Sequence, residues 1–291
     1  MTHRNNASLL NRVLPFRLRL TSAVASLCLL AACANNAPTP GINEESSPYA
    51  SLMRIADASR NAGDYTAAVG LYRRANALRP KDPEPLVRLG ATLGQLRAYN
   101  ESATAYDSAL ALQPNNAEAE RGLGNTLVSL DQLQQAITHL ETALKLDPKD
   151  ARTYSSLGVV LDMTGDHRAA QKRYREGLAI APDNLATANN LGLSLALSGN
   201  FDEAIAILRP LALHPGATAR TRQNLALVYG LSGDLDSAAR VARVDLDEAT
   251  VQHNLAYYGT LRSLADNART AAIRAHAAAV ETAITAKTNG Q

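Results

Sequence analysis

The sequence is poor in the residues that build disulfide frameworks, aromatic cores and membrane spans. It has no tryptophan, two phenylalanines and two cysteines among 291 residues. Residues 20–32 are mainly apolar, but this run is shorter than the ~20 apolar residues that cross a bilayer. We therefore expect neither a disulfide-stapled domain nor a bilayer-spanning helix.

An excess of charge of one sign is also missing once the first 32 residues are set aside. Those residues hold four arginines and no acidic residue, so the formal net charge of +2 becomes −2, with 25 basic residues against 27 acidic ones. A near-neutral chain gives no electrostatic reason to bind nucleic acid. We expect no nucleic-acid partner.

Between about Tyr49 and Leu246 the sequence repeats itself with a period of 34 residues. Prolines recur at this spacing, and so does the dipeptide Leu-Gly, which ends as Leu-Ala in the last copy. The positions are Pro80, Pro114, Pro148 and Pro182, and Leu89-Gly90, Leu123-Gly124, Leu157-Gly158, Leu191-Gly192 and Leu225-Ala226. Small and bulky residues share the register, at Ala68, Ser102, Ala136, Ala170, Ala204 and Ala238, and at Tyr72, Tyr106, Leu140, Tyr174 and Leu208.

A 34-residue period with this pattern resembles the tetratricopeptide repeat, in which each copy is a pair of antiparallel helices. The resemblance implies an all-α superhelical solenoid of about six helix-turn-helix repeats over residues 49–246. Repeat five departs from the pattern, since Pro210 falls inside its second helix and Pro215 comes one residue early, so we expect a kinked or shortened helix there.

Residues 247–291 lose the register. The stretch from Asp247 to Leu264 still predicts an amphipathic helix through Val251, Leu255, Tyr258 and Leu261, suited to cover the last apolar face of the array. The Ala-rich remainder, Asn267 to Gln291, reads equally as a further capping helix or as a loosely packed tail.

The sequence contains no pattern that assembles an active site. No two of the six histidines lie three or four residues apart, so no helical metal-binding pair exists. Phosphate-loop, HExxH and GxSxG motifs are absent. Gly122 and Gly124 resemble half of a dinucleotide motif, but no strand precedes them, and we interpret them as helix-packing glycines. We expect no enzyme activity, no cofactor, no metal and no small-molecule substrate.

The N-terminus resembles a bacterial lipoprotein signal peptide. Four arginines precede the apolar run, which ends Leu30-Ala31-Ala32-Cys33. This ending resembles a lipobox, whose cysteine becomes the first mature residue and carries acyl chains such as palmitate. We therefore expect residues 1–32 to be a signal peptide and Cys33 to be a lipid anchor; a plain signal peptide with a chance cysteine is the alternative. By the same resemblance, Ala34 rather than Asp after Cys33 points to the outer membrane instead of retention in the inner membrane, and we expect the anchored chain to face the periplasm.

Residues 33–48 are polar after the cysteine, without apolar periodicity, and predict a disordered tether. Such a tether would let the repeats work away from the lipid surface.

By resemblance to the family, positions 2, 5, 9, 12 and 13 of each repeat line the concave face. From repeat four onward positions 9 and 13 become apolar, whereas position 5 stays polar. The resulting candidate partner-binding groove consists of Val159, Met163, Asn189, Leu193, Leu197, Gln223, Leu227 and Leu231. An apolar stripe rimmed by amides suits an amphipathic helix or an extended peptide. Packing against a neighbouring helix, or under the C-terminal cap, is the alternative.

Arg121 and Asn125 resemble the start of the carboxylate clamp of tetratricopeptide-repeat co-chaperones. Ser156 stands where that clamp has asparagine, however, and Arg152 lacks a second cation beside it. We therefore interpret Arg121 as a solvated arginine rather than as part of a clamp.

The segment from Arg222 to Leu246, followed by Asn254-Leu255-Ala256-Tyr257, is similar to the C-terminal part of the TadD-type lipoproteins of tight-adherence (Tad/Flp) pilus assembly. That resemblance implies a pilotin-like role, helping an outer-membrane secretin to localise or multimerise. A lipidated scaffold for outer-membrane assembly, or a regulator of peptidoglycan synthesis, remains the alternative.

Overall fold

The computed structural model describes residues 47–264, 268 and 271–273. These residues lie in the second of two units, Met1–Ser46 and Ser47–Gln291, and form helices without a strand. The helices pair as α1 with α2, α3 with α4, and so on to α11 with α12, which confirms the all-α repeat fold. Their bounds are α1 Pro48–Asn61, α2 Tyr65–Leu78, α3 Glu84–Gln95, α4 Tyr99–Leu112, α5 Ala117–Ser129, α6 Leu133–Leu146, α7 Ala151–Thr164, α8 His167–Ile180, α9 Leu185–Leu197, α10 Phe201–Leu213, α11 Ala219–Ser232, α12 Leu235–Ala242 and α13 Glu248–Ser263.

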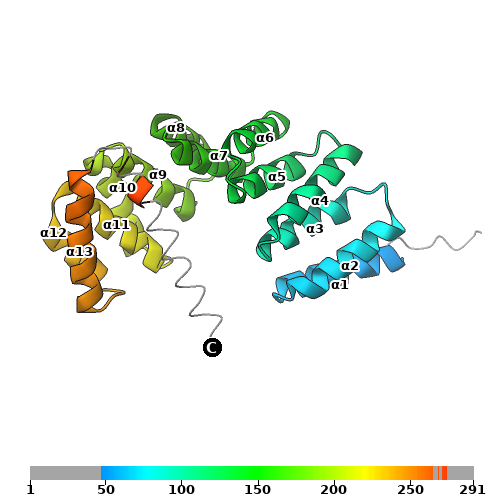
Figure 1. Ribbon diagram of the computed structural model, residues 1–291, viewed down its shortest axis with the longest axis horizontal. Helices are drawn as coiled ribbons and strands as arrows, with labels where there is room; N and C mark the ends of the chain where they lie inside the picture. The colour runs from blue at the N-terminus through cyan, green and yellow to red at the C-terminus, as the bar shows by residue number, and fades with distance from the viewer. Residues whose placement is uncertain (1–46, 265–267, 269–270, 274–291) are drawn as a thin grey trace, which may run out of the picture. The chain divides into compact units, whose positions relative to one another are not determined.

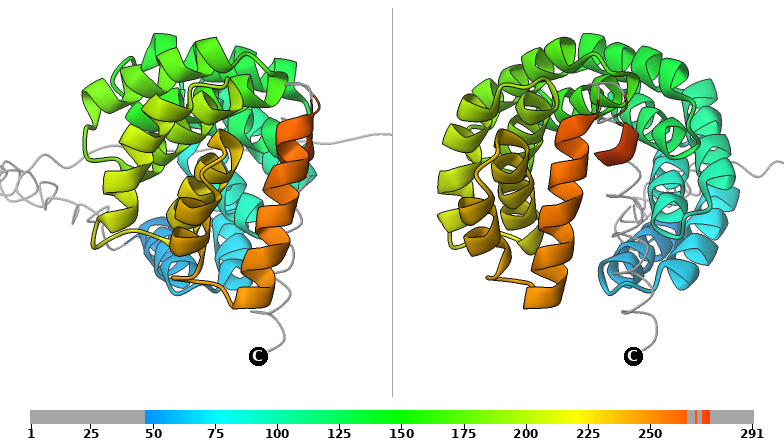
Figure 2. Two further views of the ribbon diagram at one scale, coloured as in Figure 1. Left: turned by 90° about the vertical axis from the view of Figure 1, so that its left-hand side faces the viewer. Right: turned by 60° about the vertical axis from the view of Figure 1, so that its left-hand side comes forward.

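Within this unit the helix pairs stack one after another along a curve (Figure 1, Figure 2). The first helices of successive pairs contact each other from α3 through α5, α7 and α9 to α11. The second helices make their main contacts with first helices, before and after them in the chain. Because the first helices of successive pairs contact each other, they lie on the inner side of the curve.

The glycine of each Leu-Gly dipeptide receives a large side chain from the second helix of its own repeat. A Cβ added at Gly158 would lie 2.5 Å from the ring of Tyr174, and one at Gly192 would lie 2.5 Å from Leu208. Tyr106 lies against Gly90 in its own repeat and also against Gly122 in the next one. These contacts explain why glycine and a bulky residue recur together, and they confirm that Gly122 packs helices.

The turn between the two helices of a repeat uses a left-handed residue in all six repeats. Glycine provides it in four repeats, but Arg97 and Asp131 adopt φ of 59° and 58° in repeats two and three. In three of the glycine repeats an aspartate follows and caps the second helix, as Asp166 does by accepting from the amide of Ala169. Repeats two and three have no side-chain cap at that position. Their turns are therefore the least favourable of the array.

Helix α10 shows how repeat five accommodates its extra proline. The helix continues past Pro210 and ends at Leu213, so it has 13 residues where α2, α4, α6 and α8 have 14. His214, directly before Pro215, has an extended ψ of 141°. A residue before proline avoids the helical region, which explains the early end that the sequence predicts.

The sixth repeat ends the array with a change of residue sizes. Ala226 replaces the usual glycine, and Ala242 stands where the preceding repeats have tyrosine or leucine. Both alanines are buried in one cluster with Val251 of α13, against which Leu255 also packs. Helix α13 thus fills space that a bulky residue fills in the other repeats. Its predicted apolar residues Val251, Tyr258 and Leu261 are buried.

Candidate functional site

We call the six predicted apolar positions on the inner helices of repeats four to six the apolar strip. They lie two to a helix, on α7, α9 and α11, and α9 contacts both of the other helices. The members are Val159, Met163, Leu193, Leu197, Leu227 and Leu231. The fold therefore places on neighbouring helices of one array the residues that the 34-residue period had related only in sequence.

The strip divides into a buried part and a partly exposed part. Leu197 and Leu231 are only 7% and 4% exposed and belong to the hydrophobic cluster that runs through the last repeats. Val159, Leu193 and Leu227 are partly exposed and pack against that cluster, and Met163 is also partly exposed. A partner can therefore cover the second group, whereas Leu197 and Leu231 serve mainly the core of the full chain.

The structure does not place the two predicted rim amides, Asn189 and Gln223, as free hydrogen-bonding groups on an exposed rim. Asn189 is 5% exposed, and its side-chain oxygen accepts a hydrogen bond from Asn224 Nδ2 at 3.2 Å. Gln223 is partly buried, and its Nε2 atom has no hydrogen-bond partner among the residues that the structure describes. Asn189 thus links α9 to α11, a role that the sequence pattern did not indicate.

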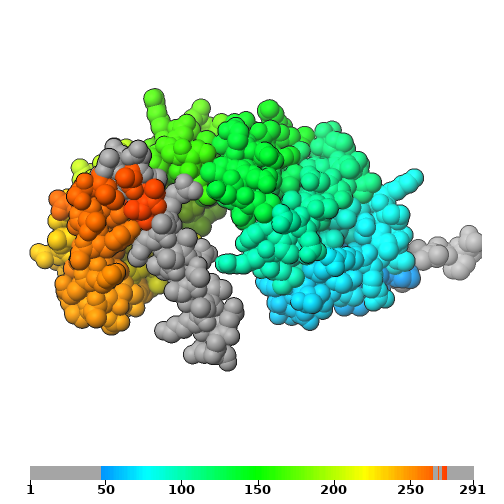
Figure 3. All heavy atoms as spheres, in the orientation of Figure 1, coloured from blue at the N-terminus to red at the C-terminus, as the bar shows by residue number. Residues whose placement is uncertain are grey.

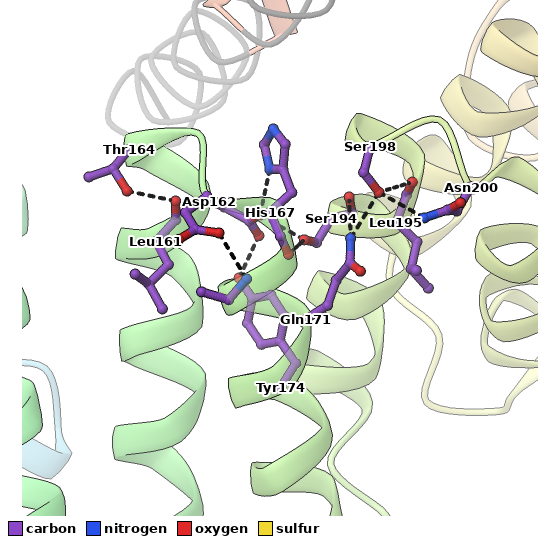
Figure 4. Close-up of polar contacts among 12 residues, drawn as sticks. Leu161, Asp162, Thr164, His167, Gln171, Tyr174, Ser194, Leu195, Ser198 and Asn200 are labelled. Atoms are coloured by element: carbon purple, nitrogen blue, oxygen red, sulfur yellow. Dashed lines mark hydrogen bonds and ion pairs between the residues drawn. The ribbon is translucent and has the colours of Figure 1, made fainter.

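A polar network centred on Asp162 of α7 holds three helices together beside the strip (Figure 4). Asp162 accepts hydrogen bonds from Ser194 Oγ of α9 at 2.7 Å and from the hydroxyl of Tyr174 of α8 at 3.0 Å. His167 Nδ1 lies 2.8 Å from the same carboxylate. Burial and the nearby Asp162 carboxylate raise the pKa of Tyr174, so the hydroxyl stays protonated and donates.

The same network extends to the turn that precedes α10. Gln171 Nε2 donates to the carbonyl of Ser194 at 3.2 Å and to Ser198 Oγ at 2.9 Å. Sequence reasoning missed this cluster. Its signal was the lone acidic residue at position 12 of repeat four, where repeats two, three, five and six have Gly94, Val128, Ala196 and Gly230. The network fixes the spacing of α7 and α9, and with it the spacing of the strip.

The inner helices of the first three repeats present a different surface. Asn61, Gln95, Asn125 and Ser129 are exposed at the positions that are apolar in the later repeats. Asp57 accepts from the hydroxyl of Tyr72 at 2.6 Å and pairs with Arg88 at 2.8 Å. Polar and apolar inner surfaces therefore occupy opposite halves of the array.

The residues that resemble a carboxylate clamp are paired inside the repeat unit. Arg121 Nε lies 2.9 Å from Asp150 Oδ2, and Arg152 Nε donates to Asp150 Oδ1 at 3.0 Å. Although partial burial opposes it, hydrogen bonds from Arg152 and Thr153 and the charge of Arg121 hold the pKa of Asp150 below its usual range. Arg121 is therefore largely buried and paired with Asp150, so its interpretation as a solvated arginine was wrong, whereas Arg152 is exposed.

The segment that resembles TadD-type lipoproteins covers most of α11, all of α12, the turn after it and residues 254–257 of α13. Arg222 on α11 donates two hydrogen bonds to the carboxylate of Asp245, through Nε at 2.8 Å and through Nη2. Arg243 likewise donates two hydrogen bonds to the carboxylate of Glu248, through Nε at 2.9 Å and Nη2 at 3.0 Å. The hydrogen bonds from Arg243 lower the pKa of Glu248 to about 2. These pairs fix α13 against the last repeat.

Other kinds of site are not evident in the part of the chain that the structure describes. It contains no group of three or more His, Cys, Asp or Glu side chains placed to hold a metal ion, and none of its helices is long and apolar enough to cross a membrane. A shallow hollow of about 540 Å³ lies far from the strip, at α1 and α2, beside Leu52, Ile55 and Leu78. The predicted signal peptide, the predicted lipidation site Cys33 and most of the predicted tether fall outside the described residues.

Three tetratricopeptide-repeat family models match the sequence, over residues 51–86, 116–183 and 156–218. Their spans fall on the helix pairs described above. The fold is a tetratricopeptide-repeat solenoid. No curated protein matches the sequence.

Solved structures of tetratricopeptide-repeat solenoids superpose on most of the array. The pilF structure from Pseudomonas aeruginosa is 18% identical, covers 72% of this chain and 97% of its own, and has a TM-score of 0.61. TTC0263 from Thermus thermophilus is 23% identical, with coverage of 62% and 98% and a TM-score of 0.54. YrrB, a tetratricopeptide-repeat protein with an unusual peptide-binding site, is 20% identical, with coverage of 63% and 96% and a TM-score of 0.51. At these identities the likeness establishes the fold.

Proposed function

We propose that this chain is a lipid-anchored scaffold of the outer membrane that binds a segment of a partner protein on the apolar strip. The observation that carries the proposal is the repetition of partly exposed apolar residues, Val159, Leu193 and Leu227, at one position of three adjacent inner helices. A partner that covers them gains ~25 cal/mol for each Å² of apolar surface removed from water. An amphipathic helix offers such a surface at matching spacing. Peptide binding by the structurally similar YrrB supports the same use of the fold.

The candidate partner is an outer-membrane secretin subunit, and the role is that of a pilotin-like assembly factor for a tight-adherence pilus. Support comes from the lipobox ending at Cys33 and from the Arg222–Tyr257 segment. In the fold that segment supplies the Arg222–Asp245 and Arg243–Glu248 pairs that seat the end of the array. The competing role is a lipidated scaffold or regulator for outer-membrane or peptidoglycan assembly, which would use the same strip for a different client.

Affinity capture from detergent-solubilised outer membranes tests both the surface and the client. The wild-type chain should enrich a secretin subunit, and Leu193→Asp should lose it because a carboxylate would be desolvated under the bound segment. Asn125→Asp is the matched control, since Asn125 is exposed at the equivalent position of repeat three. Equal capture by Leu193→Asp, with helicity preserved in circular dichroism, would remove the strip as the binding site. Enrichment of a peptidoglycan synthase instead of a secretin would select the competing role.

The anchor is tested separately. We expect Cys33 to incorporate a fatty-acid label in cells, and the mature protein to sediment with outer membranes, because two or three acyl chains anchor stably where one does not. Label that persists in Cys33→Ser would contradict this assignment.

A further inference from the structure

The chain returns to the apolar cluster after α13. Ile273 is 7% exposed and is a buried member of the same cluster as Leu197 and Leu231. Ala272 packs against this cluster, and its carbonyl accepts a hydrogen bond from the hydroxyl of Tyr257 at 3.0 Å. Figure 2 shows Ala271–Ile273 on the inner side of the curve, and Figure 3 shows it beside α13. A short piece of this chain therefore already occupies the cluster that borders the strip.

This covering is found at the end of the array where the inner helices are apolar. The corresponding polar residues of the first three repeats, such as Asn61, Gln95 and Asn125, are exposed. The inner positions of repeats four to six form part of an apolar cluster, and Ile273 adds an apolar side chain to it. The same positions of repeats one to three carry mainly exposed polar side chains, which would not favour an apolar side chain there. Ala271–Ile273 thus packs in the apolar cluster to which Leu197 and Leu231 of the strip belong.

Helix α13 and Ala271–Ile273 differ in how firmly they are held. Helix α13 buries Val251 and Leu261 completely and seats Tyr258 directly on Gly230. Ala271–Ile273 contributes one large apolar side chain, Ile273, flanked by the exposed Ala271 and the partly buried Ala272. Since stabilisation by burial scales with the apolar area removed from water, the short piece is held far more weakly than the helix. It can leave the cluster while α13 stays in place.

We propose that Ala271–Ile273 is an internal competitor for the apolar strip, and that a partner segment binds only after it has been displaced. The proposal rests on the function proposed above and adds regulation to the same site. It also defines the ligand: a helical segment with an aliphatic side chain that takes the place of Ile273. A chain that holds its own competitor binds a partner more weakly, in proportion to the fraction of molecules in which the strip is free.

Binding of a peptide in trans tests the competition. The probe is a fluorescein-labelled synthetic peptide of residues 264–291, titrated by anisotropy against the full chain carrying Cys33→Ser in detergent. In a chain that also carries Ile273→Asp the internal segment is disabled, and we expect the peptide to bind roughly tenfold more tightly than to the chain with Ile273 intact. Ala271→Asp is the matched control, because Ala271 is exposed, and it should bind like the chain with Ile273 intact. A labelled peptide that itself carries Ile273→Asp should not bind.

A milder variant keeps the test decisive if Ile273→Asp disturbs folding. Ile273→Ala should give an intermediate affinity, with an unchanged circular dichroism melt. Adding Leu227→Ala to the Ile273→Asp chain should weaken peptide binding, which places the peptide on the strip. Equal peptide affinity with and without the Ile273 substitutions would overturn the proposal. That result leaves the proposed function standing if Leu193→Asp still abolishes partner capture. Conversely, competition without any partner capture would remove the proposed function alone.

Discussion

The ring of Tyr258 lies directly on Gly230, at a point of α11 where any side chain would overlap it. The contact joins the capping helix α13 to the last inner helix of the array. Tyr258 is only 4% exposed, and this burial is possible because Gly230 has no side chain. The position of α13 therefore depends on a glycine of α11 that lies more than twenty residues earlier in the sequence.

Gly230→Ala should destabilise the end of the array. The added methyl group would push Tyr258 away, and overpacking of this kind costs roughly 1–3 kcal/mol. Gly70→Ala is the control, because Gly70 lies inside α2 with open space around it. That change should stabilise the chain by about 0.5–1 kcal/mol through helix propensity. Urea unfolding followed by circular dichroism measures both, and equal stability of the two variants would contradict the contact.

Leu157→Ala should destabilise the array through its core. Leu157 is completely buried between repeats three and four, and truncating such a leucine costs roughly 2–5 kcal/mol. Leu213→Ala provides the comparison, since Leu213 is 81% exposed and its loss should change the free energy of unfolding by about 0.5 kcal/mol or less. A thermal melt of Leu157→Ala within error of wild type would show that the core is misassigned.

Giving repeat two the Gly-Asp turn of repeats one, four and six should stabilise the protein. Arg97→Gly would remove a left-handed residue with a side chain, and Ala98→Asp would supply the missing cap. Together they should add ~1–2 kcal/mol to the free energy of unfolding. The reverse exchange in repeat four, Gly165→Arg with Asp166→Ala, should remove a similar amount. If both double variants shift the urea midpoint in the same direction, the turn argument fails.

Stability should fall at alkaline pH because of buried tyrosines. Burial raises the pKa of Tyr106 and of Tyr258 to about 12, whereas an unfolded tyrosine titrates near 10. Between these values the folded chain keeps protons that the unfolded chain releases, so the free energy of unfolding falls as pH rises through this window. Each tyrosine contributes at most ~1.4 kcal/mol per pH unit.

Urea titrations at pH 8 and pH 11 measure this loss, and absorbance at 295 nm reports the tyrosinates. Tyr106→Phe keeps the ring against Gly90 and Gly122 but has no proton to lose, so its pH dependence should be shallower than that of wild type. A wild-type free energy that stays constant between pH 8 and pH 11 would contradict the raised pKa values.

The repeat register could be predicted from sequence because each feature of the period has a physical partner within one helix pair. Tyr174 packs on Gly158 because glycine leaves room for its ring, and a proline follows the second helix in each of the first five pairs. A 34-residue pattern therefore predicts both helices and their contact. The early end of α10 followed from Pro215 for the same reason. Contacts within one helix pair, and the prolines that follow it, were therefore enough to predict the helices and their pairing.

The site was harder to predict, because position within a repeat does not state what covers a residue. Leu193 and Leu197 occupy repeat positions 9 and 13, which were both expected to line the concave face. Leu197 is nevertheless buried in the cluster, whereas Leu193 is partly exposed. Asn189 was expected on the rim, and its burial depends on Asn224 in the next repeat. The Asp162 network joins three helices through pairs up to 32 residues apart, which no short pattern encodes.

The small residue at Ala242 has a consequence for how such an array can grow. Val251 of α13 shares a cluster with Ala242 and Ala226, so a standard helix pair added after α12 would meet an alanine where it needs a tyrosine or leucine, and would leave a void. Inserting a copy between repeats three and four would meet no such mismatch, because Leu140 and Tyr174 keep the usual sizes on both sides. Duplication can lengthen this protein from within, but not past Ala242.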